Sequence, residues 1–297
     1  MRFISKNRTI THFSANMEPI TDVSLQETIT VETHDCYGGQ IDSENVLRPD
    51  VNLETMNQAT GPIYVNGVEK GDVLQIEIEE IELDPRGVMV TSKGLGVLGD
   101  HIEEPTTKIF PVKEGRICFK EDFIFPVRPM IGVIGVAPAS GSVHCASPGD
   151  HGGNLDTKDI TIGSKLYFPV FQDGALFALG DLHASMGDGE LDGTGVEIGG
   201  RTTLTVRAVK CGTLEAPVVE TADSFMFLAS AKTLDEAIRK GSKRVVGHLQ
   251  QELSLEFQEA YRLLSMLCDV RISQIVNPLV TVRIVVPKEL LPRLFKK

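Results

Sequence analysis

The sequence predicts a mainly β protein: a jelly-roll-like antiparallel β-sandwich followed by a smaller C-terminal α+β unit. The 28 glycines and 15 prolines break the chain into short segments, as turns between strands do. Aromatic residues are scarce and Trp is absent, so Val, Ile and Leu, which favour extended structure, must build the core. The character changes after about residue 215. We therefore expect a β-rich body over 1–215 and an α+β unit over 216–297.

The first half of the chain contains strands with one irregular segment between them. The first thirty residues predict two strands joined at 16–19, and residues 35–61 are irregular and rich in Gly, Asn and Asp. Over 72–83, apolar and polar residues alternate, which is typical of a half-buried strand. The alternation shifts by one near 79–80, which predicts a β-bulge. Further strands are expected at 108–119 and 131–136.

Two hairpins are expected in the next part of the chain. Strand 165–171 is followed by 174–180 across a short Gln-Asp-Gly turn, so the two are predicted to pair. Strand 195–198 is followed by 201–209 across Gly199-Gly200, a dipeptide that tight hairpin turns favour.

The tail is predicted to be a strand–helix–helix–strand–strand unit. Thr233-Leu-Asp-Glu236 forms a capping box and predicts a helix that begins after Thr233 and ends near His248. Ser254 is expected to cap a second helix. Strands near 270–276 and 279–286 follow.

Charge and cysteine usage limit the environment and the partners. The net charge of −12, with no long Lys/Arg cluster, argues against nucleic acid and anionic membranes as partners. Five widely spaced cysteines without a CxxC pair suit a reducing compartment. No signal-like segment or bilayer-length apolar run is visible. We expect a cytoplasmic protein and a homodimer, although no motif requires the latter.

The segment Gly180-Asp-Leu-His-Ala-Ser-Met-Gly-Asp-Gly-Glu190 concentrates metal-binding residue types. If 174–183 is a strand, Asp181 and His183 lie two residues apart and project from one face. The Gly-Asp-Gly turn after them can bring Glu190 back towards the pair. One imidazole and two carboxylates that converge in this way predict a divalent-metal site.

Two other segments are candidates for the same site. In Ser147-Pro-Gly-Asp-His-Gly-Gly-Asn-Leu-Asp-Thr-Lys-Asp159, Asn154 and Asp156 could present two oxygen ligands, or they could form a local Asx turn. In Thr33-His-Asp-Cys-Tyr-Gly-Gly39, Asp35 or His34 could complete the site. An Asp before a Gly-rich loop is also a common turn former.

The 180–190 segment closely resembles a signature of the acetamidase/formamidase family. The segment Pro148-Gly-Asp-His-Gly-Gly-Asn-Leu-Asp-Thr-Lys-Asp159 resembles a second signature of that family, centred on Gly-Gly-Asn-x-Asp. Met130-Ile-Gly-Val-Ile-Gly-Val-Ala-Pro138 and Lys165-Leu-Tyr-Phe-Pro-Val170 agree as well. Order and spacing match the family across roughly 125–200.

The resemblance implies a hydrolase that converts small aliphatic amides, formamide or acetamide, into carboxylic acid and ammonia with the help of a bound divalent metal. It also implies a jelly-roll-like sandwich. The family's metal and catalytic positions carry over to Asp181, His183 and Glu190, with Asn154, Asp156 and Asp35 beside them. The resemblance thus implies metal ligation by Asp181, His183, Glu190, Asp156 and Asp35, and catalytic roles for Glu190, Asn154 and His183. Glu190 is assigned as a ligand or as the general base, and Asn154 could bind the substrate carbonyl or a second ion.

Metal identity and two other functions stay open. Histidine favours zinc, whereas carboxylate, amide and carbonyl oxygens favour calcium or magnesium, so we expect zinc and allow calcium in addition. One alternative is an amidase with Cys145 as nucleophile, although His144 beside it would point to the opposite strand face. The other is a metal-stabilised jelly-roll module that binds a small ligand without catalysis.

Overall fold

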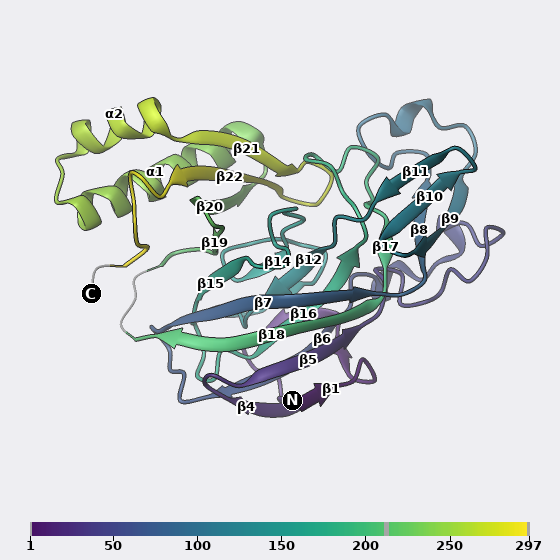
Figure 1. Ribbon diagram of the computed structural model, residues 1–297, viewed down its shortest axis with the longest axis horizontal. Coiled ribbons are helices and arrows are strands. Elements are labelled where there is room, and N and C mark those ends of the chain that lie inside the picture. Colours follow the sequence, from purple (N-terminus) through teal and green to yellow (C-terminus); the bar gives the residue numbers. More distant parts are fainter. Residues whose placement is uncertain (1, 211–213, 296–297) are drawn as a thin grey trace.

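The computed structural model describes residues 2–210 and 214–295, and the chain is mainly β with two helices near its C-terminal end (Figure 1). The predicted fold class is therefore confirmed. Two large sheets face each other across a common apolar core, and the helices cover one end of the first sheet. Among the named strands of the described residues, pairing is antiparallel except between β1 and β5 and between β4 and β6.

Among the described residues the first sheet has nine strands, ordered β1-β5-β18-β7-β15-β19-β20-β22-β21. Their bounds in that order are Arg2–Ile4, Thr28–Thr33, Gly200–Val209, Val73–Leu83, Lys165–Pro169, Val218–Glu220, Ser224–Ala231, Val280–Pro287 and Asp269–Gln274. The C-terminal strands continue this sheet through the pairing of β15 with β19. The division of the chain at residue 215 stays a prediction.

The second sheet has eleven strands in the part of the chain that the structure describes, and eight of them follow one path, β11-β10-β9-β8-β17-β16-β12-β14. Their bounds in that order are Phe123–Pro126, Arg116–Lys120, Thr106–Lys113, Arg86–Thr91, Glu197–Ile198, Phe177–His183, Met130–Gly135 and Gly152–Asn154. Strand β6 (Ala59–Asn66) also pairs with β16 and carries β2 (Thr9–Ile10) and β4 (Thr21–Ser24). A small separate sheet joins β3 (His12–Ser14) to β13 (Ser142–His144), and short 3₁₀ turns cover Arg48–Asp50, Leu53–Thr55 and Gly99–His101.

The main core lies between the two sheets. Val31 and Ile76 from the first sheet and Ile131 and Leu179 from the second are fully buried in one apolar cluster. Burial of each such side chain contributes about 1.5–3 kcal/mol, and this burial holds the sheets together. Strand β16 lies at the centre of the second sheet and is buried along its whole length.

Several local predictions agree with the structure. Residue Glu79 is the extra residue of a bulge, because Thr203 pairs with Glu80 and Leu204 pairs with Ile78. The stretch predicted to be irregular, 35–61, is free of strands up to residue 58 and contains short 3₁₀ segments, but its last three residues belong to β6.

Both predicted hairpins are wrong. Strand β15 pairs with β7 and β19 in the first sheet, whereas β16 lies in the second sheet. Likewise, β17 pairs with β16 and β8, and β18 pairs with β5 and β7. In each case the short connection carries the chain from one sheet to the other. Conversely, the single strand expected at 108–119 is a true hairpin of β9 and β10, which turns at Glu114 and Gly115.

The C-terminal helices follow their capping signals with one exception. Helix α1 (Leu234–Leu253) begins after Thr233, whose side chain accepts a hydrogen bond from the backbone N–H of Glu236, and it runs five residues beyond His248. Ser254 does not cap the second helix: its left-handed conformation ends α1. Helix α2 (Phe257–Leu267) begins after Glu256, which forms a capping box with Glu259.

The two helices pack on one face of the C-terminal strands. Val245 and Leu249 of α1 and Leu264 of α2 share a cluster with Phe227 and Ile284 of β20 and β22. The opposite face of these strands therefore points towards the body of the protein. No helix within the described residues combines the length and apolar character needed to span a bilayer.

We predict that Thr233→Ala lowers the free energy of unfolding by about 1 kcal/mol, because the first turn of α1 loses its capping acceptor. Urea denaturation followed by circular dichroism would measure the change. Lys232→Ala, one residue outside the helix, is the control and should leave the denaturation midpoint unchanged. Equal midpoints for Thr233→Ala and the wild type would contradict the assigned cap.

Candidate metal centre

Strand β16 supplies an aspartate and the only imidazole of the described cluster. The Nε2 atom of His183 lies 3.6 Å from Oδ1 of Asp181, and each side chain is 1% exposed. Gly180, just before them, has no room for a side chain, because a Cβ would lie 2.1 Å from the carbonyl oxygen of Gln58. The strand is thus pressed against the loop that precedes β6.

The 147–156 segment reaches the same point from β14. Oδ1 of Asp156 lies 3.8 Å from Nε2 of His183, and Asp156 is fully buried. Asn154 pairs with Val133 at the end of β14 and is also buried. The structure therefore brings Asp156 of this segment to the imidazole, and Asn154 lies two residues before it on the adjoining strand.

The loop after β16 returns Glu190 to the site. The backbone N–H of Glu190 donates to the carbonyl oxygen of Gly187 at 3.1 Å, which closes the tight turn expected from the Gly-Asp-Gly sequence. One ligand atom each of Asp156, His183 and Glu190 lies within 4.8 Å of the others, and all three side chains are buried. These three side chains form the first of two groups that could hold a cation.

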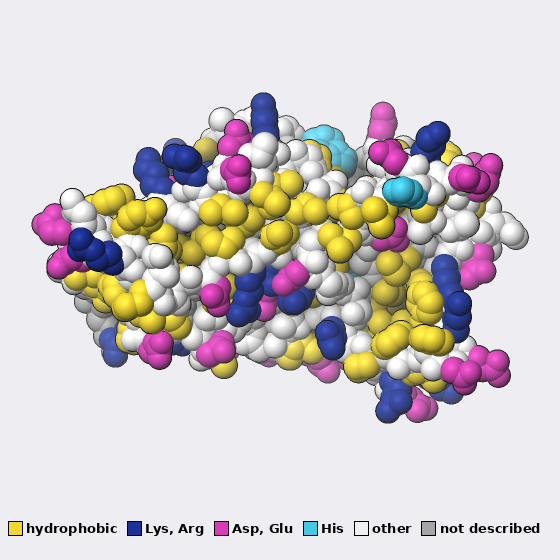
Figure 2. Space-filling model, turned by 90° about the horizontal axis from the view of Figure 1, so that it is seen from above, with side chains coloured by type: hydrophobic (Ala, Val, Ile, Leu, Met, Phe, Trp, Pro, Cys, Tyr) yellow, Lys and Arg dark blue, Asp and Glu magenta, His cyan; other side chains and the backbone are white. Residues whose placement is uncertain are grey.

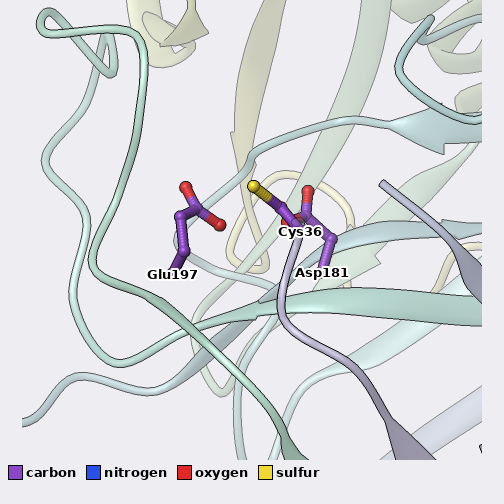
Figure 3. Close-up of side chains that lie close together, drawn as sticks. All are labelled: Cys36, Asp181 and Glu197. Carbon is purple, nitrogen blue, oxygen red and sulfur yellow. The ribbon is translucent and has the colours of Figure 1, made fainter. Parts of the chain in front are cut away.

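A second group lies directly beside the first, and two of its members, Cys36 and Glu197, were missed in the sequence. Sγ of Cys36 and carboxylate oxygens of Asp181 and Glu197 also lie within 4.8 Å of one another, and Figure 3 shows the three side chains facing a common space. Oε2 of Glu197 is only 3.1 Å from Nε2 of His183, so the two groups form one continuous cluster. Asn57 donates to Oδ2 of Asp181 at 2.8 Å.

Asp35 lies outside both groups. Its Oδ1 accepts hydrogen bonds from the backbone N–H groups of Tyr37 at 2.9 Å and Gly39 at 3.0 Å. This is the turn-forming arrangement that the sequence left open as an alternative. The next residue, Cys36, is the one that reaches the cluster.

Three acidic residues of the cluster have a left-handed backbone conformation. The φ angles of Asp156, Asp181 and Glu190 are 40°, 57° and 50°. Such conformations cost about 1–3 kcal/mol per residue, and they cluster at sites where the surrounding structure fixes a functional geometry. Local backbone geometry, and not strand alternation alone, therefore aims these carboxylates at the imidazole.

The crowding of charge shifts the pKa of each group. Burial raises the pKa of Asp156 to about 6 and that of Glu197 to about 8, and it raises the pKa of Glu190 well above its ordinary value. For His183, burial acts to lower the pKa, but the charges of Glu197 and Asp181 outweigh it and raise the pKa. The raised pKa values of these carboxyl groups therefore reflect the cost of burying several negative charges side by side.

The donor atoms fit a bound cation. The following buried atoms have no hydrogen-bond partner among the described residues: an oxygen each of Asn154, Asp156, Asp181, Glu190 and Glu197, and Nδ1 of His183. Buried polar atoms normally have hydrogen-bond partners. A buried polar atom without one in a native structure indicates a bound ligand, an ion or water. Imidazole with carboxylates suits zinc, and the neighbouring thiol would add a softer ligand.

The alternative nucleophile Cys145 lies in a different environment. Its thiol is fully buried and donates to the carbonyl oxygen of Ile10 at 3.5 Å. Burial raises its pKa to about 12, so the thiol stays protonated. Because the thiolate is the reactive form, this environment does not activate Cys145.

The chain belongs to the Acetamidase/Formamidase family, whose sequence profile matches residues 4–145 and 139–293. A formamidase of Methylophilus methylotrophus is 30% identical over 254 residues, which cover 65% of this chain and 62% of that protein. An acetamidase of Mycolicibacterium smegmatis is 28% identical over 263 residues, covering 66% and 64%. The chain thus spans less than two thirds of the length of these relatives.

A solved structure matches the whole chain. The crystal structure of an acetamidase from Bacillus halodurans superposes with a TM-score of 0.96 at 42% sequence identity and covers 99% of this chain and 100% of its own. The fold and the family assignment therefore extend over both the β-rich body and the C-terminal helices.

We predict that Gly132→Ala weakens divalent-metal binding and raises the dissociation constant for added zinc by about 10-fold or more, as for other disturbed metal-ligand shells. A Cβ at this position of β12 would lie 2.6 Å from Oδ1 of Asp156 and 2.8 Å from Oδ2 of Asp181, so both carboxylates must move. Competition with a chromogenic chelator would measure the affinity.

Gly187→Ala is the matched control for this change. It lies in the loop before Glu190, but a Cβ there meets no atom within 4 Å. Its affinity for zinc should equal that of the wild type. If Gly132→Ala binds zinc as tightly as this control, the carboxylates of Asp156 and Asp181 are not ligands.

Proposed function

We propose that this protein hydrolyses small aliphatic amides, such as formamide and acetamide, to carboxylate and ammonia in a metal-dependent reaction. One observation carries the proposal: a buried imidazole surrounded by carboxylates whose ligand atoms lack partners. Membership of the Acetamidase/Formamidase family supports the substrate class. The names of the formamidase and acetamidase relatives agree with it.

The proposed ligand set is built around His183. Asp156 and Asp181 supply carboxylate oxygens, Glu190 is either a further ligand or the general base, and Glu197 and Cys36 extend the set on the second side. Zinc is the proposed ion because it accepts imidazole, carboxylate and thiolate together. Calcium is the proposed additional ion, held through oxygen ligands. Asp35 keeps a supporting role through the turn that presents Cys36.

The chemistry needs an activated water and a stabilised carbonyl oxygen. When bound, a divalent ion polarises a carbonyl and acidifies water. Glu190 serves as the general base, because its carboxylate lies within the His183 group and is buried from bulk solvent. Asn154 donates its side-chain N–H to the substrate carbonyl. The proton that Glu190 gains then passes to the departing nitrogen, which leaves as ammonia.

The environment and assembly of the protein are part of the proposal. The described cysteines 36, 118, 145 and 268 are free thiols, which supports a cytoplasmic location. A homodimer is proposed because hydrophobic side chains gather on one face of the molecule, including the end that carries β9–β11 (Figure 2). Strand β11 is the terminal strand of its sheet, and Phe123, Ile124 and Phe125 are each at least half exposed.

We predict that Ile124→Glu converts a dimer of the 32.4 kDa chain into a monomer, because a charge on an apolar edge strand opposes its pairing with a second copy. Size-exclusion chromatography with light scattering would measure the mass. Phe3→Glu, at an exposed apolar residue of β1, is the control and should stay dimeric. A wild-type protein that is monomeric at micromolar concentration would refute the proposed assembly.

The central test is ammonia release from formamide and acetamide after chelation and after single additions of zinc, manganese or calcium. Activity should disappear with the chelator and return with one metal. His183→Ala and Glu190→Gln should each lower kcat/KM by about 100-fold or more. The exposed His101→Ala variant is the control and should keep full activity.

Two outcomes would count against the proposal. Hydrolysis that survives complete removal of metal would exclude a metal-dependent mechanism. If no metal restores ammonia release while zinc still binds tightly, the cluster is a structural metal site of a ligand-binding module.

A further inference from the structure

The largest fully buried side chain of the described residues is that of Arg283, on β22. Its neighbour Ile284 packs against the helices, so Arg283 points to the other face of the strand, towards the body. A buried guanidinium is costly unless its donors are met by acceptors. Its partners therefore identify what this residue holds in position.

Arg283 joins two acidic residues from separate segments. Its Nη2 donates to both carboxylate oxygens of Asp188, at 2.7 and 2.9 Å. Its Nε lies 2.8 Å from Oδ2 of Asp159, within ion-pair distance. Nη1 donates to the carbonyl oxygen of Ile272 at 2.7 Å, which fixes the guanidinium against β21.

Both acidic partners flank residues of the metal centre. Asp188 stands two residues before Glu190, and Asp159 stands three residues after Asp156. A single side chain thus spans the two segments that carry these carboxylates. Lys158 adds a contact to Asp188 at 3.0 Å from its own segment.

The turn between β21 and β22 makes further contacts with the same two segments. Nδ2 of Asn277 donates to Oδ2 of Asp156 at 2.7 Å and to the carbonyl oxygen of Asn154 at 3.3 Å. The backbone N–H of Gly189 donates to the carbonyl oxygen of Ser273 at 2.9 Å. The N–H of Ile275 donates back to Gly189 at 3.2 Å.

We infer that the β21–β22 hairpin is the outer frame of the metal centre and that Arg283 and Asn277 are its positioning residues. Asn277 orients the Asp156 carboxylate directly. Arg283 sets the spacing between the Asp156 and Glu190 segments through Asp159 and Asp188. Arginine suits this role because its planar fork holds a carboxylate in a fixed orientation, which a lysine cannot do. The expected effect of these residues on metal binding rests on the proposed function, whereas their contacts with the two segments do not.

The test removes the Asp188 carboxylate, one partner of Arg283, and leaves the buried Arg283 side chain in place. In Asp188→Ala the zinc dissociation constant should rise by about 10- to 100-fold, the range found when a partner of a metal ligand is lost. Asp192→Ala is the matched control, because it removes an acidic side chain two residues after Glu190 in the same loop. It should leave the affinity unchanged. Arg283→Lys should lie between Asp188→Ala and the wild type, and Arg283→Met should equal or exceed the loss in Asp188→Ala.

Hydrogen exchange of the metal-free protein provides a second readout that needs no catalysis. Amides of residues 187–191 and 156–159 should exchange faster in Asp188→Ala than in the wild type and in Asp192→Ala. Unchanged exchange and unchanged zinc affinity would overturn the inference. If the wild type binds no metal and releases no ammonia, but exchange still quickens in Asp188→Ala, the proposed function fails while the frame stands.

Discussion

The burial of several carboxylates around one imidazole is the constraint on which the rest of this structure depends. Asp156, Asp181, Glu190 and Glu197 crowd around His183 where water is excluded. Like charges in such a place repel each other and lose their hydration, so a stable arrangement needs protons or a cation. The raised pKa values of Asp156, Glu190 and Glu197 express this need in the protein alone.

The two-sheet architecture supplies a place where such a cluster can form. The residues of the cluster come from β16 and the loop after it, from the segment after β14, from β17 and from the loop between β5 and β6. These segments meet at the centre of the second sheet, where β16 has neighbours on both sides. Gly132 and Gly195 leave room for the polar groups, since a Cβ on Gly195 would lie 2.5 Å from Nδ1 of His183. Small residues of the sheet thus form the walls of the site.

Sequence patterns predicted the β-rich class, the bulge near Glu79 and the first helix cap, because each depends on neighbouring residues. They also pointed to both signature segments of the site. The hairpins were wrong because β16 is buried on both faces and its composition does not indicate its partner strand. Glu197 was missed because it lies in a two-residue strand that resembled a surface hairpin. Asn57 and Asn277 are ordinary turn residues in the sequence, and only tertiary contacts reveal their roles.

The contacts of the site join distant parts of the chain, and this has a consequence for how the protein folds. Asn57 and Asp181 are 124 positions apart, and Asn277 and Asp156 are 121 positions apart. Contacts with such long sequence separations form slowly, because chain entropy is lost before they contribute stability. Strands β5 and β18 pair across a still longer separation, because Thr30 and Thr203 are 173 positions apart, so the cluster and the sheets face the same kind of entropic cost. The carboxylates lose their hydration only where these distant segments meet, and desolvation of the site is therefore tied to the closure of the two sheets.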